Sequence, residues 1–332
     1  MSKSVLLIGG AGYIGPIIAE ELLADGHLVT VLDRLVYDNK FAVKSCLANQ
    51  KFRFIQGDMG NTTHLTDALI GISDVVILAG LVGDPITKKY PEESKNINDV
   101  SVKKCMKFLA DKKLEHIIFV STCSNYGLIP EGVLADESYP TAPLSPYAKS
   151  KVENEQFLLS GLGNSRFSPT VLRFATAFGV APRMRFDLTV NEFTRDIALG
   201  KELLVFDPDT WRPYCHVRDF ADIVRLVLAA PKELVTNEIF NAGSEVNNYT
   251  KRQVVESIIK HFPNAQIHYK ENGTDPRNYK VNFSKIRDVL GFAPRYTVEM
   301  GVLEVLAYIK SEGFVYSEIN KNHYGNYVLD IK

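Results

Sequence analysis

The chain has 332 residues, of which 45% are hydrophobic and 23% are charged, and its net charge is −1. This length predicts two domains or one large α/β unit with an extension, and the near-neutral charge gives no support to a nucleic-acid or anionic-membrane function. The four cysteines are scattered, and no apolar run has the length of a signal peptide or a membrane span, so we expect no metal site, no disulfide framework and a cytoplasmic location.

Short apolar runs alternate with helix-length segments through the first half of the chain. The runs are SVLLIG, LVTVLD, FRFIQGD, DVVILAG, HIIFVS and PTVLRF, and the helical patterns cover residues 13–25, 91–111 and 146–160. This alternation predicts right-handed βαβ units around a parallel sheet. Continuous apolar strands are typical of a sheet that helices cover on both faces. The predicted fold class is therefore α/β, with a Rossmann-type doubly wound parallel sheet.

The pattern changes after about residue 175. Short strands and helices there mix with Pro- and Arg-rich loops such as VAPRMRFD and DPDTWRPYCHVRD. We interpret residues 1–175 as a dinucleotide-binding domain and residues 176–332 as a smaller mixed α/β domain that binds the substrate. Some later segments, at about 213–245, are expected to return to the first domain.

The first strand is followed by a glycine-rich loop. The stretch LLIGGAGYIGPIIAEEL places Gly9, Gly12 and Gly15 in the pattern G-x-x-G-x-x-G, directly before a helix. Glycines at these positions permit a tight turn and let backbone N–H groups approach a pyrophosphate at the helix N-terminus. The motif alone would also suit a strand–turn–helix packed through small residues.

An acid at the end of the second strand favours the cofactor interpretation. Asp33 lies 18 residues after Gly15, where a carboxylate accepts hydrogen bonds from the adenosine ribose of NAD and repels the extra phosphate of NADP. The adjacent Arg34 weakens that preference. Asp58, in QGDM after the third strand, is either an adenine contact or an ordinary loop carboxylate. NAD is the predicted cofactor.

Three further residues suggest catalytic chemistry. Tyr147 and Lys151, in SPYAKSKVENE, are four residues apart and share one face of the predicted helix. The lysine and the positive nicotinamide would lower the pKa of the phenol, so that Tyr147 could serve as general acid or base. Thr122, at the carboxyl edge of a parallel strand, could hydrogen-bond the same substrate oxygen. Each residue alone is unremarkable, but their order behind the glycine loop argues against coincidence.

The sequence resembles the extended short-chain dehydrogenase/reductases that act on nucleotide sugars, the group typified by UDP-galactose 4-epimerase. The resemblance covers nearly the whole chain, through GGAGYIG, STCSNYG, YAKSK, LRFATAFG, RPYCHVRDFADIV and DPRNYKVNFSKIRDVLGF. It implies that Thr122 is the catalytic Ser/Thr, Tyr147 the acid/base and Lys151 the lysine that contacts the nicotinamide ribose. It also matches Asn96 with the asparagine of the family's N-V-x-G-T segment.

The resemblance implies further binding residues. The expected cofactor contacts are Gly9, Gly12, Tyr13, Ile14, Gly15, Asp33, Arg34, Asp58, Met59, Ala79, Asn96, Tyr147 and Lys151. The expected substrate contacts are Ser124, Thr176, Arg185, Arg212 and Arg277. Arg212 and Arg277 match pyrophosphate clamps, for which bidentate guanidinium groups are suited. Thr176 is a weaker candidate, and Arg183 and Arg185 are either substrate-facing or part of a solvated loop.

The residues after Thr122 bear on the reaction type. The 4,6-dehydratases of this family resemble Thr-Asp-Glu there, and their two carboxyl groups protonate the leaving hydroxyl and remove the carbon-5 proton. Cys123 and Ser124 are poor substitutes at neutral pH, so we do not expect a dehydratase. Cys123 is expected to be a small buried packing residue, and Ser124 a substrate contact.

The leading prediction is an NAD-dependent enzyme that oxidises and reduces a nucleotide sugar at carbon 4, foremost an epimerase. A 4-dehydrogenase or 4-ketoreductase that exchanges its cofactor would use the same residues. Non-catalytic NAD-binding regulators of this fold typically lose the Tyr or the Lys, and both are present here. The resemblance further implies a homodimer joined by helices 91–111 and 146–160.

Overall fold

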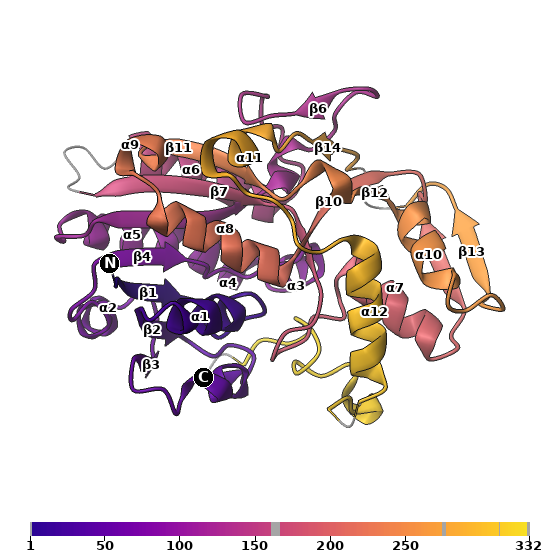
Figure 1. Ribbon diagram of the computed structural model, residues 1–332, viewed down its shortest axis with the longest axis horizontal. Helices are drawn as coiled ribbons and strands as arrows, with labels where there is room; N and C mark the ends of the chain where they lie inside the picture. Colours follow the sequence, from indigo (N-terminus) through magenta and orange to yellow (C-terminus); the bar gives the residue numbers. More distant parts are fainter. Residues whose placement is uncertain (1, 161–166, 274–276, 312, 331–332) are drawn as a thin grey trace.

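The computed structural model describes residues 2–160, 167–273, 277–311 and 313–330. Its main layer is a seven-stranded sheet in the order β11-β7-β5-β4-β1-β2-β3, and all neighbouring strands run parallel (Figure 1). The strands are β1 (Ser4–Ile8), β2 (Leu28–Asp33), β3 (Phe52–Gln56), β4 (Asp74–Ile77), β5 (His116–Thr122), β7 (Ser168–Phe174) and β11 (Glu238–Ala242). Each apolar run that the sequence singled out forms one of these strands, which confirms the predicted α/β class and doubly wound sheet.

Helices cover the sheet on both faces, as the continuous apolar strands predict. One face packs against α1 (Gly15–Ala24), α8 (Val217–Ala229) and α11 (Ser284–Leu290). The other packs against α2 (Thr62–Ala68), α5 (Val102–Ala110) and α6 (Pro146–Ser160). The two hydrophobic clusters formed in this way hold the strands rigidly and fix the positions of their carboxyl ends.

The predicted helix over residues 91–111 has an irregular middle. It consists of α4 (Pro91–Lys95), a π-helical stretch η2 (Asn96–Ser101) and α5, and it is preceded by α3 (Asp84–Lys89). A π turn changes which side chains share a face of the helix, and such turns occur often at functional sites. The helix predicted over 146–160 coincides with α6.

The later part of the chain builds smaller sheets beside the main one. A mixed three-stranded sheet contains β8 (Thr176–Phe178), β10 (Trp211–His216) and β12 (Asn248–Thr250). Parallel pairs join β9 (Leu203–Phe206) to β13 (Ile267–Lys270) and β6 (Leu134–Ala135) to β14 (Lys280–Val281). Around them lie α7 (Thr189–Ala198), α9 (Lys232–Val235), α10 (Lys251–Ile259) and α12 (Val298–Ile309), and the short helices are η1 (Lys40–Cys46), η3 (Cys123–Tyr126), η4 (Glu245–Asn247) and η5 (Tyr316–Glu318).

The chain leaves the main sheet after β7 and returns to it as α8 and β11. Residues 176–216 and 244–330, apart from α11, supply the elements beside the sheet, and α7, α10, α12 and β13 lie together on one side of the molecule (Figure 1). The division into two domains at residue 175 stays a prediction. What matters for the site is that β8 continues from β7 after a single residue, so the second group of elements begins at the carboxyl edge of the sheet.

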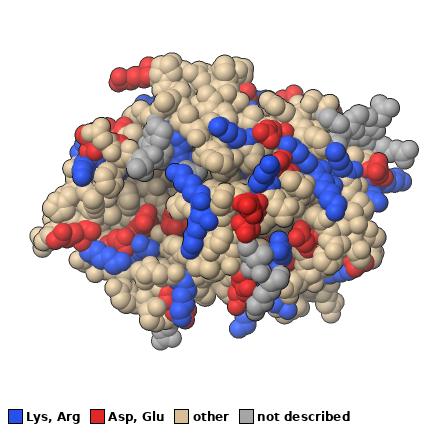
Figure 2. All heavy atoms as spheres, turned by 180° about the vertical axis from the view of Figure 1, so that it is seen from behind, with Lys and Arg blue, Asp and Glu red and all other residues tan. Residues whose placement is uncertain are grey.

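The surface carries charges of both signs. On the face shown in Figure 2, Lys and Arg side chains are interspersed with Asp and Glu. Among the described helices, none combines the length and apolarity that crossing a bilayer requires. Over the same residues, no cluster of three or more His, Cys, Asp or Glu side chains is arranged to hold a metal ion.

Candidate active site

A cavity of about 430 Å³ opens at the carboxyl ends of the parallel strands, where open α/β sheets bind their ligands. Its walls come from the loops after the strands of the main sheet and from residues of the later segments, which are Thr176, Ala177, Arg183, Arg185, Asp187, Leu188, Thr189, Arg212, Lys251, Arg277, Tyr279 and Asn326. Among the residues predicted to contact cofactor or substrate, those that line it are Gly9, Gly12, Tyr13, Ile14, Gly15, Asp33, Arg34, Asp58, Met59, Ala79, Thr122, Ser124, Tyr147, Lys151, Thr176, Arg185, Arg212 and Arg277.

The three glycines of the loop have different structural roles. Gly9 has a φ of +80°, and a Cβ there would lie 2.5 Å from the Cα of Ala79. At Gly15 a Cβ would collide with the backbone of Gly10, so this glycine lets helix α1 pack against the loop. At Gly12 a Cβ would meet only the carbonyl oxygen of Gly9, at 3.6 Å, and would otherwise project into the cavity. The loop therefore leaves room for a ligand at the N-terminus of α1.

Asp33 ends β2 at the same edge of the cavity. Its Oδ2 accepts the backbone N–H of Ala11 at 2.9 Å, and its Oδ1 accepts that of Leu35 at 2.8 Å. Burial raises the pKa of Asp33, although both N–H groups and Arg183 act in the opposite direction. Nearby, Arg34 forms an ion pair with Asp58 at 3.4 Å, with both side chains about one-third exposed. Asp33 is thus held in place by the glycine loop itself.

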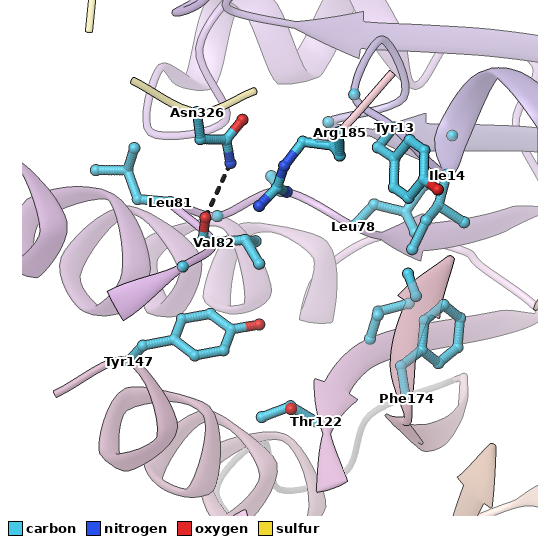
Figure 3. Close-up of a pocket in the computed structure, with 18 of the residues that line it drawn as sticks. Tyr13, Ile14, Leu78, Leu81, Val82, Thr122, Tyr147, Phe174, Arg185 and Asn326 are labelled. Carbon is cyan, nitrogen blue, oxygen red and sulfur yellow. Dashed lines mark hydrogen bonds between the residues drawn. The ribbon is translucent and has the colours of Figure 1, made fainter. Parts of the chain in front are cut away.

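Tyr147, Lys151 and Thr122 meet on the opposite side of the cavity. Tyr147 points its hydroxyl towards the middle of the pocket, with Thr122 beside it (Figure 3). The Nζ of Lys151 lies 5.8 Å from the centre of the Tyr147 ring and donates to the carbonyl oxygen of Val120 at 2.7 Å. Burial lowers the pKa of Lys151 to about 8, and Glu155 opposes the shift. All three side chains line one cavity, where hydroxyl groups beside a lysine are able to support acid/base chemistry at a ligand oxygen.

The residues after Thr122 form a tight turn. The Oγ1 of Thr122 accepts the N–H of Ser124 at 3.1 Å and lies 3.0 Å from the Oγ of Ser124. Cys123 is 1% exposed, and burial raises its pKa well above the ordinary value. This confirms the expectation that Cys123 is a buried packing residue. Ser124 lines the cavity while Cys123 does not.

A buried polar network supports this turn, and sequence reasoning missed it. Glu155 lies on α6 four residues after Lys151 and receives hydrogen bonds from Ser121, from Asn125 at 2.7 Å and from the Nη2 of Arg173 at 2.8 Å. Arg173 is on β7, so the network ties β5, α6 and β7 together under the site. The available signal was a glutamate at i+4 from a catalytic lysine, which would place it on the same helix face.

One predicted cofactor contact is displaced. Asn96 is exposed at the start of η2 and does not line the cavity. Asn98 is the buried asparagine of this segment: its Oδ1 accepts the N–H of Leu81 at 2.7 Å, and its Nδ2 donates to the carbonyl oxygen of Leu81 at 3.0 Å. The structure therefore does not place Asn96 among the cofactor contacts, and Asn98 is the residue that holds the loop after β4.

Apart from Arg34, the arginines among the described residues that line the cavity fall into two pairs. Arg212 donates to the carbonyl oxygen of Arg277 at 2.5 Å and lies over the ring of Tyr279, 5.2 Å from its centre. Arg183 and Arg185 come from the loop between β8 and α7, and both are nearly fully buried. The interpretation of this loop as a solvated surface is wrong.

Several lining residues had no signal in the sequence. Asp187 forms a bidentate ion pair with Arg185, and Asn326 donates from its Nδ2 to the carbonyl oxygen of Val82 at 2.8 Å (Figure 3). Tyr37 lies under the guanidinium group of Arg183. Asn326 and Tyr37 reach their partners over large sequence distances, whereas Asp187 is two residues from Arg185 but belongs to no recognisable motif.

The cavity fits a dinucleotide. The open side of Gly12 at the N-terminus of α1 would receive a pyrophosphate, Asp33 would receive the adenosine ribose, and Tyr147 with Lys151 would reach the nicotinamide ribose. None of these side chains blocks the cavity they line. The donor set is consistent with NAD.

The family model described as the NAD-dependent epimerase/dehydratase family matches residues 5–243. Among curated relatives, the UDP-glucose 4-epimerase of Corynebacterium glutamicum is 28% identical over 311 residues, covering 88% of this chain and 91% of its own. The dTDP-glucose 4,6-dehydratase of Streptomyces niveus is 25% identical over 323 residues, covering 92% of each chain.

The fold also matches solved structures. The UDP-glucuronic acid 4-epimerase of Bacillus cereus, solved with UDP-glucuronic acid and NAD, superposes with a TM-score of 0.83 and 24% sequence identity, covering 92% of this chain and 99% of its own. At this identity the likeness concerns the fold.

Proposed function

Because the chain belongs to the NAD-dependent epimerase/dehydratase family, we propose that it is a nucleotide-sugar epimerase that inverts carbon 4 of the sugar. The family supplies the cofactor and the nucleotide-sugar class. We propose in addition that carbon 4 is the reacting carbon, that the reaction is epimerisation and not elimination, and that the individual residues have the roles given below.

The observation that carries the proposal is the chemistry of the cavity around Tyr147. Thr122 and Tyr147 offer hydroxyl groups, and Lys151 offers a buried positive charge beneath the phenol. The positions where the resemblance assigns the two carboxyl groups of a 4,6-dehydratase hold Cys123 and Ser124. Of the described residues that line the cavity, the acids are Asp33, Asp58 and Asp187. None of them is next to Thr122 in the sequence, and Asp187 is already bound by Arg185.

The residues suggest a division of labour. Tyr147 takes the proton of the carbon-4 hydroxyl as the sugar is oxidised and returns it as the keto group is reduced. Lys151 stabilises the phenolate by its charge, and Thr122 hydrogen-bonds the reacting oxygen. The cofactor, when bound, supplies the hydride acceptor and donor for carbon 4. Arg212 and Arg277 are suited to the substrate's pyrophosphate, which leaves the sugar free to turn between the two hydride transfers.

The test is a product assay with Tyr147→Phe as the matched variant. Purified protein is incubated with UDP-, dTDP- and GDP-hexoses, and the products are resolved by NMR. An epimerase yields the carbon-4 epimer without net NADH. Tyr147→Phe should fold, bind NAD and lose roughly 10²- to 10⁴-fold in turnover.

Other products would replace the proposal with a specific alternative. Stoichiometric NADH together with a 4-keto sugar would identify a dehydrogenase. A 4-keto-6-deoxy sugar would identify a 4,6-dehydratase, despite the absence of carboxyl groups at positions 123 and 124. Wild-type turnover by Tyr147→Phe would move the chemistry away from this tyrosine.

A further inference from the structure

Arg183 and Arg185 line the same cavity as Asp33, and the charge of Arg183 acts on the carboxylate of Asp33. The guanidinium carbon of Arg183 is 4.6 Å from the centre of the Tyr37 ring, and Tyr37 follows the strand that ends at Asp33. The Nη2 of Arg185 lies 3.8 Å from the point that a Cβ of Gly83 would occupy, in the loop after β4. Both arginines therefore lie against loops that follow strands of the main sheet.

The backbone of Arg185 is tied to the glycine loop through one side chain. The Nδ2 of Asn191 donates to the carbonyl oxygen of Arg185 at 3.0 Å and to the hydroxyl of Tyr13 at 2.9 Å. Tyr13 belongs to the glycine-rich loop that lines the cavity at the start of α1. In Figure 3 the Arg185 side chain reaches into the pocket between Tyr13 and Val82, across from Tyr147 and Thr122.

The two arginines differ in how their donors are used. Arg183 donates from Nε to the carbonyl oxygen of Asn322 at 3.1 Å and from Nη2 to Gly325 and Asn326, so it holds the C-terminal segment. Arg185 directs Nε and Nη2 to the two carboxylate oxygens of Asp187, each at 2.7 Å. Within the described part of the chain, the Nη1 of Arg185 has no hydrogen-bond acceptor, although the side chain is only 6% exposed.

We propose that Arg185 binds the pyrophosphate of the dinucleotide cofactor, and not that of the nucleotide sugar. The glycine loop fixes the pyrophosphate at the N-terminus of α1, where backbone N–H groups supply only partial positive charge. A buried guanidinium group on the facing wall supplies the full charge that two phosphates need, with donors in a fork that suits them. This assignment departs from the expectation that Arg185 contacts the substrate.

Asp187 prepares Arg185 for this role. Burial opposes the charge on Arg185, but the adjacent carboxylate outweighs it, and the pKa of Arg185 lies above its ordinary value. The bidentate pair also fixes the plane of the guanidinium group before a ligand arrives, which lowers the entropy lost on binding. Because the proposal depends on the cofactor and not on the reaction at carbon 4, it stands or falls separately from the epimerase function.

The experiment compares ligands that differ in their phosphates. Arg185→Gln and the paired change Arg185→Gln with Asp187→Asn are made in the full chain. The double variant removes both charges and leaves two amide side chains that can hydrogen-bond to each other. Binding of NADH is followed by fluorescence, ADP-ribose and adenosine are measured as competitors, and UDP, dTDP and GDP are measured by calorimetry. Arg277→Gln is the matched control from the other arginine pair.

Both Arg185 variants should weaken NADH and ADP-ribose binding by roughly 10- to 150-fold, the range for hydrogen bonds to a charged group. Adenosine, which lacks phosphate, and the nucleoside diphosphates should bind as they do to the wild type. Arg277→Gln should instead weaken binding of the nucleoside diphosphates and leave NADH and ADP-ribose binding unchanged. Unchanged NADH affinity, or a loss confined to the nucleoside diphosphates, overturns the assignment. If neither amide variant folds, Arg185→Lys is used, because lysine keeps the positive charge but lacks the paired N–H donors of the guanidinium group. Wild-type NADH affinity in Arg185→Lys would also overturn the assignment of Arg185 to the pyrophosphate.

Discussion

Among single side chains, Asp33 has the most constrained position, because its two oxygens already accept N–H groups from Ala11 and Leu35. The carboxylate therefore stabilises the glycine loop and the end of β2 before any ligand binds. Its remaining lone pairs can still accept ribose hydroxyl groups. Cofactor choice and local stability depend here on the same two oxygens.

We predict that Asp33→Asn narrows the preference for NADH over NADPH by about tenfold, because the repulsion of the extra phosphate is lost. It should also lower the melting temperature, since one oxygen is replaced by a donor that faces an N–H group. Fluorescence titrations with both cofactors and a thermal melt measure the two effects. Asp58→Asn serves as the control at a partly exposed acid. A wild-type protein that prefers NADPH would contradict the role given to Asp33.

Thr122 gives a second test at this scale. Its Oγ1 accepts the N–H of Ser124 and Thr122 lines the cavity, so Thr122→Val removes the turn's hydrogen bond and the proposed contact with substrate. Turnover should fall by about tenfold, less than for Tyr147→Phe, because no proton is transferred through this hydroxyl. Thr122→Ser, which keeps the hydroxyl group, should retain the wild-type turnover. Single-turnover absorbance at the NADH band measures both, and a valine variant as slow as Tyr147→Phe would place Thr122 in the proton relay.

At the scale of strands and helices, β5 joins the catalytic turn at one end to a buried histidine at the other. The Nε2 of His116 lies 2.7 Å from the Oγ1 of Thr170 on β7, and Thr170 itself donates to the carbonyl oxygen of Val235 at 2.6 Å. The threonine proton is therefore engaged, and Nε2 of His116 must be the donor. Burial lowers the pKa of His116 from 6.5 to about 4.

This lowered pKa predicts an acid sensitivity with a defined sign. In the unfolded chain His116 takes up a proton as the pH falls through 6.5, whereas in the folded protein it stays neutral until about 4. Protonation of the unfolded chain therefore lowers the free energy of unfolding as the pH falls from 6.5 to 4. The stability that neutral His116 contributes is complete above pH 6.5, and about 2 kcal/mol of it is lost at pH 5. His116→Gln should remove this loss. Urea denaturation at pH 7.5 and pH 5 compares the two proteins, and equal pH dependence would contradict the prediction.

The elements that the sequence reveals share a physical property. Strands buried on both faces are continuous apolar runs, and α6 has an uninterrupted helical pattern, so both could be located from local sequence. The sequence could not show which of Asn96 and Asn98 is buried, because the two are only two positions apart. The π-helical stretch determines that Asn98 faces inward. Arg183 and Asn326 are 143 positions apart, and their contact depends on how the chain packs in three dimensions.

For the molecule as a whole, we predict a homodimer formed through η2, α5 and α6. Their outward side is mixed: Val100 is 51% exposed, while Lys103 pairs with Glu153 at 3.1 Å across the two helices. Sedimentation velocity at micromolar concentration should give twice the 37.1 kDa of one chain. Val100→Glu should shift the equilibrium towards the monomer, because it places a charge in the apolar part of the contact. A wild-type protein that sediments only as a monomer would exclude this assembly.

The C-terminal segment closes the cofactor cavity from a great distance along the chain. Besides the contacts of Asn326, the N–H of Asp330 donates to the carbonyl oxygen of Val36 at 2.8 Å, and Leu329 packs with Tyr37 and Leu81. The ribosome translates these residues after the whole of the glycine loop and the main sheet. A nascent chain whose last residues are still inside the exit tunnel therefore lacks one wall of its cofactor site. The complete NAD site therefore forms only after these residues have left the tunnel and packed against the loops after β2 and β4.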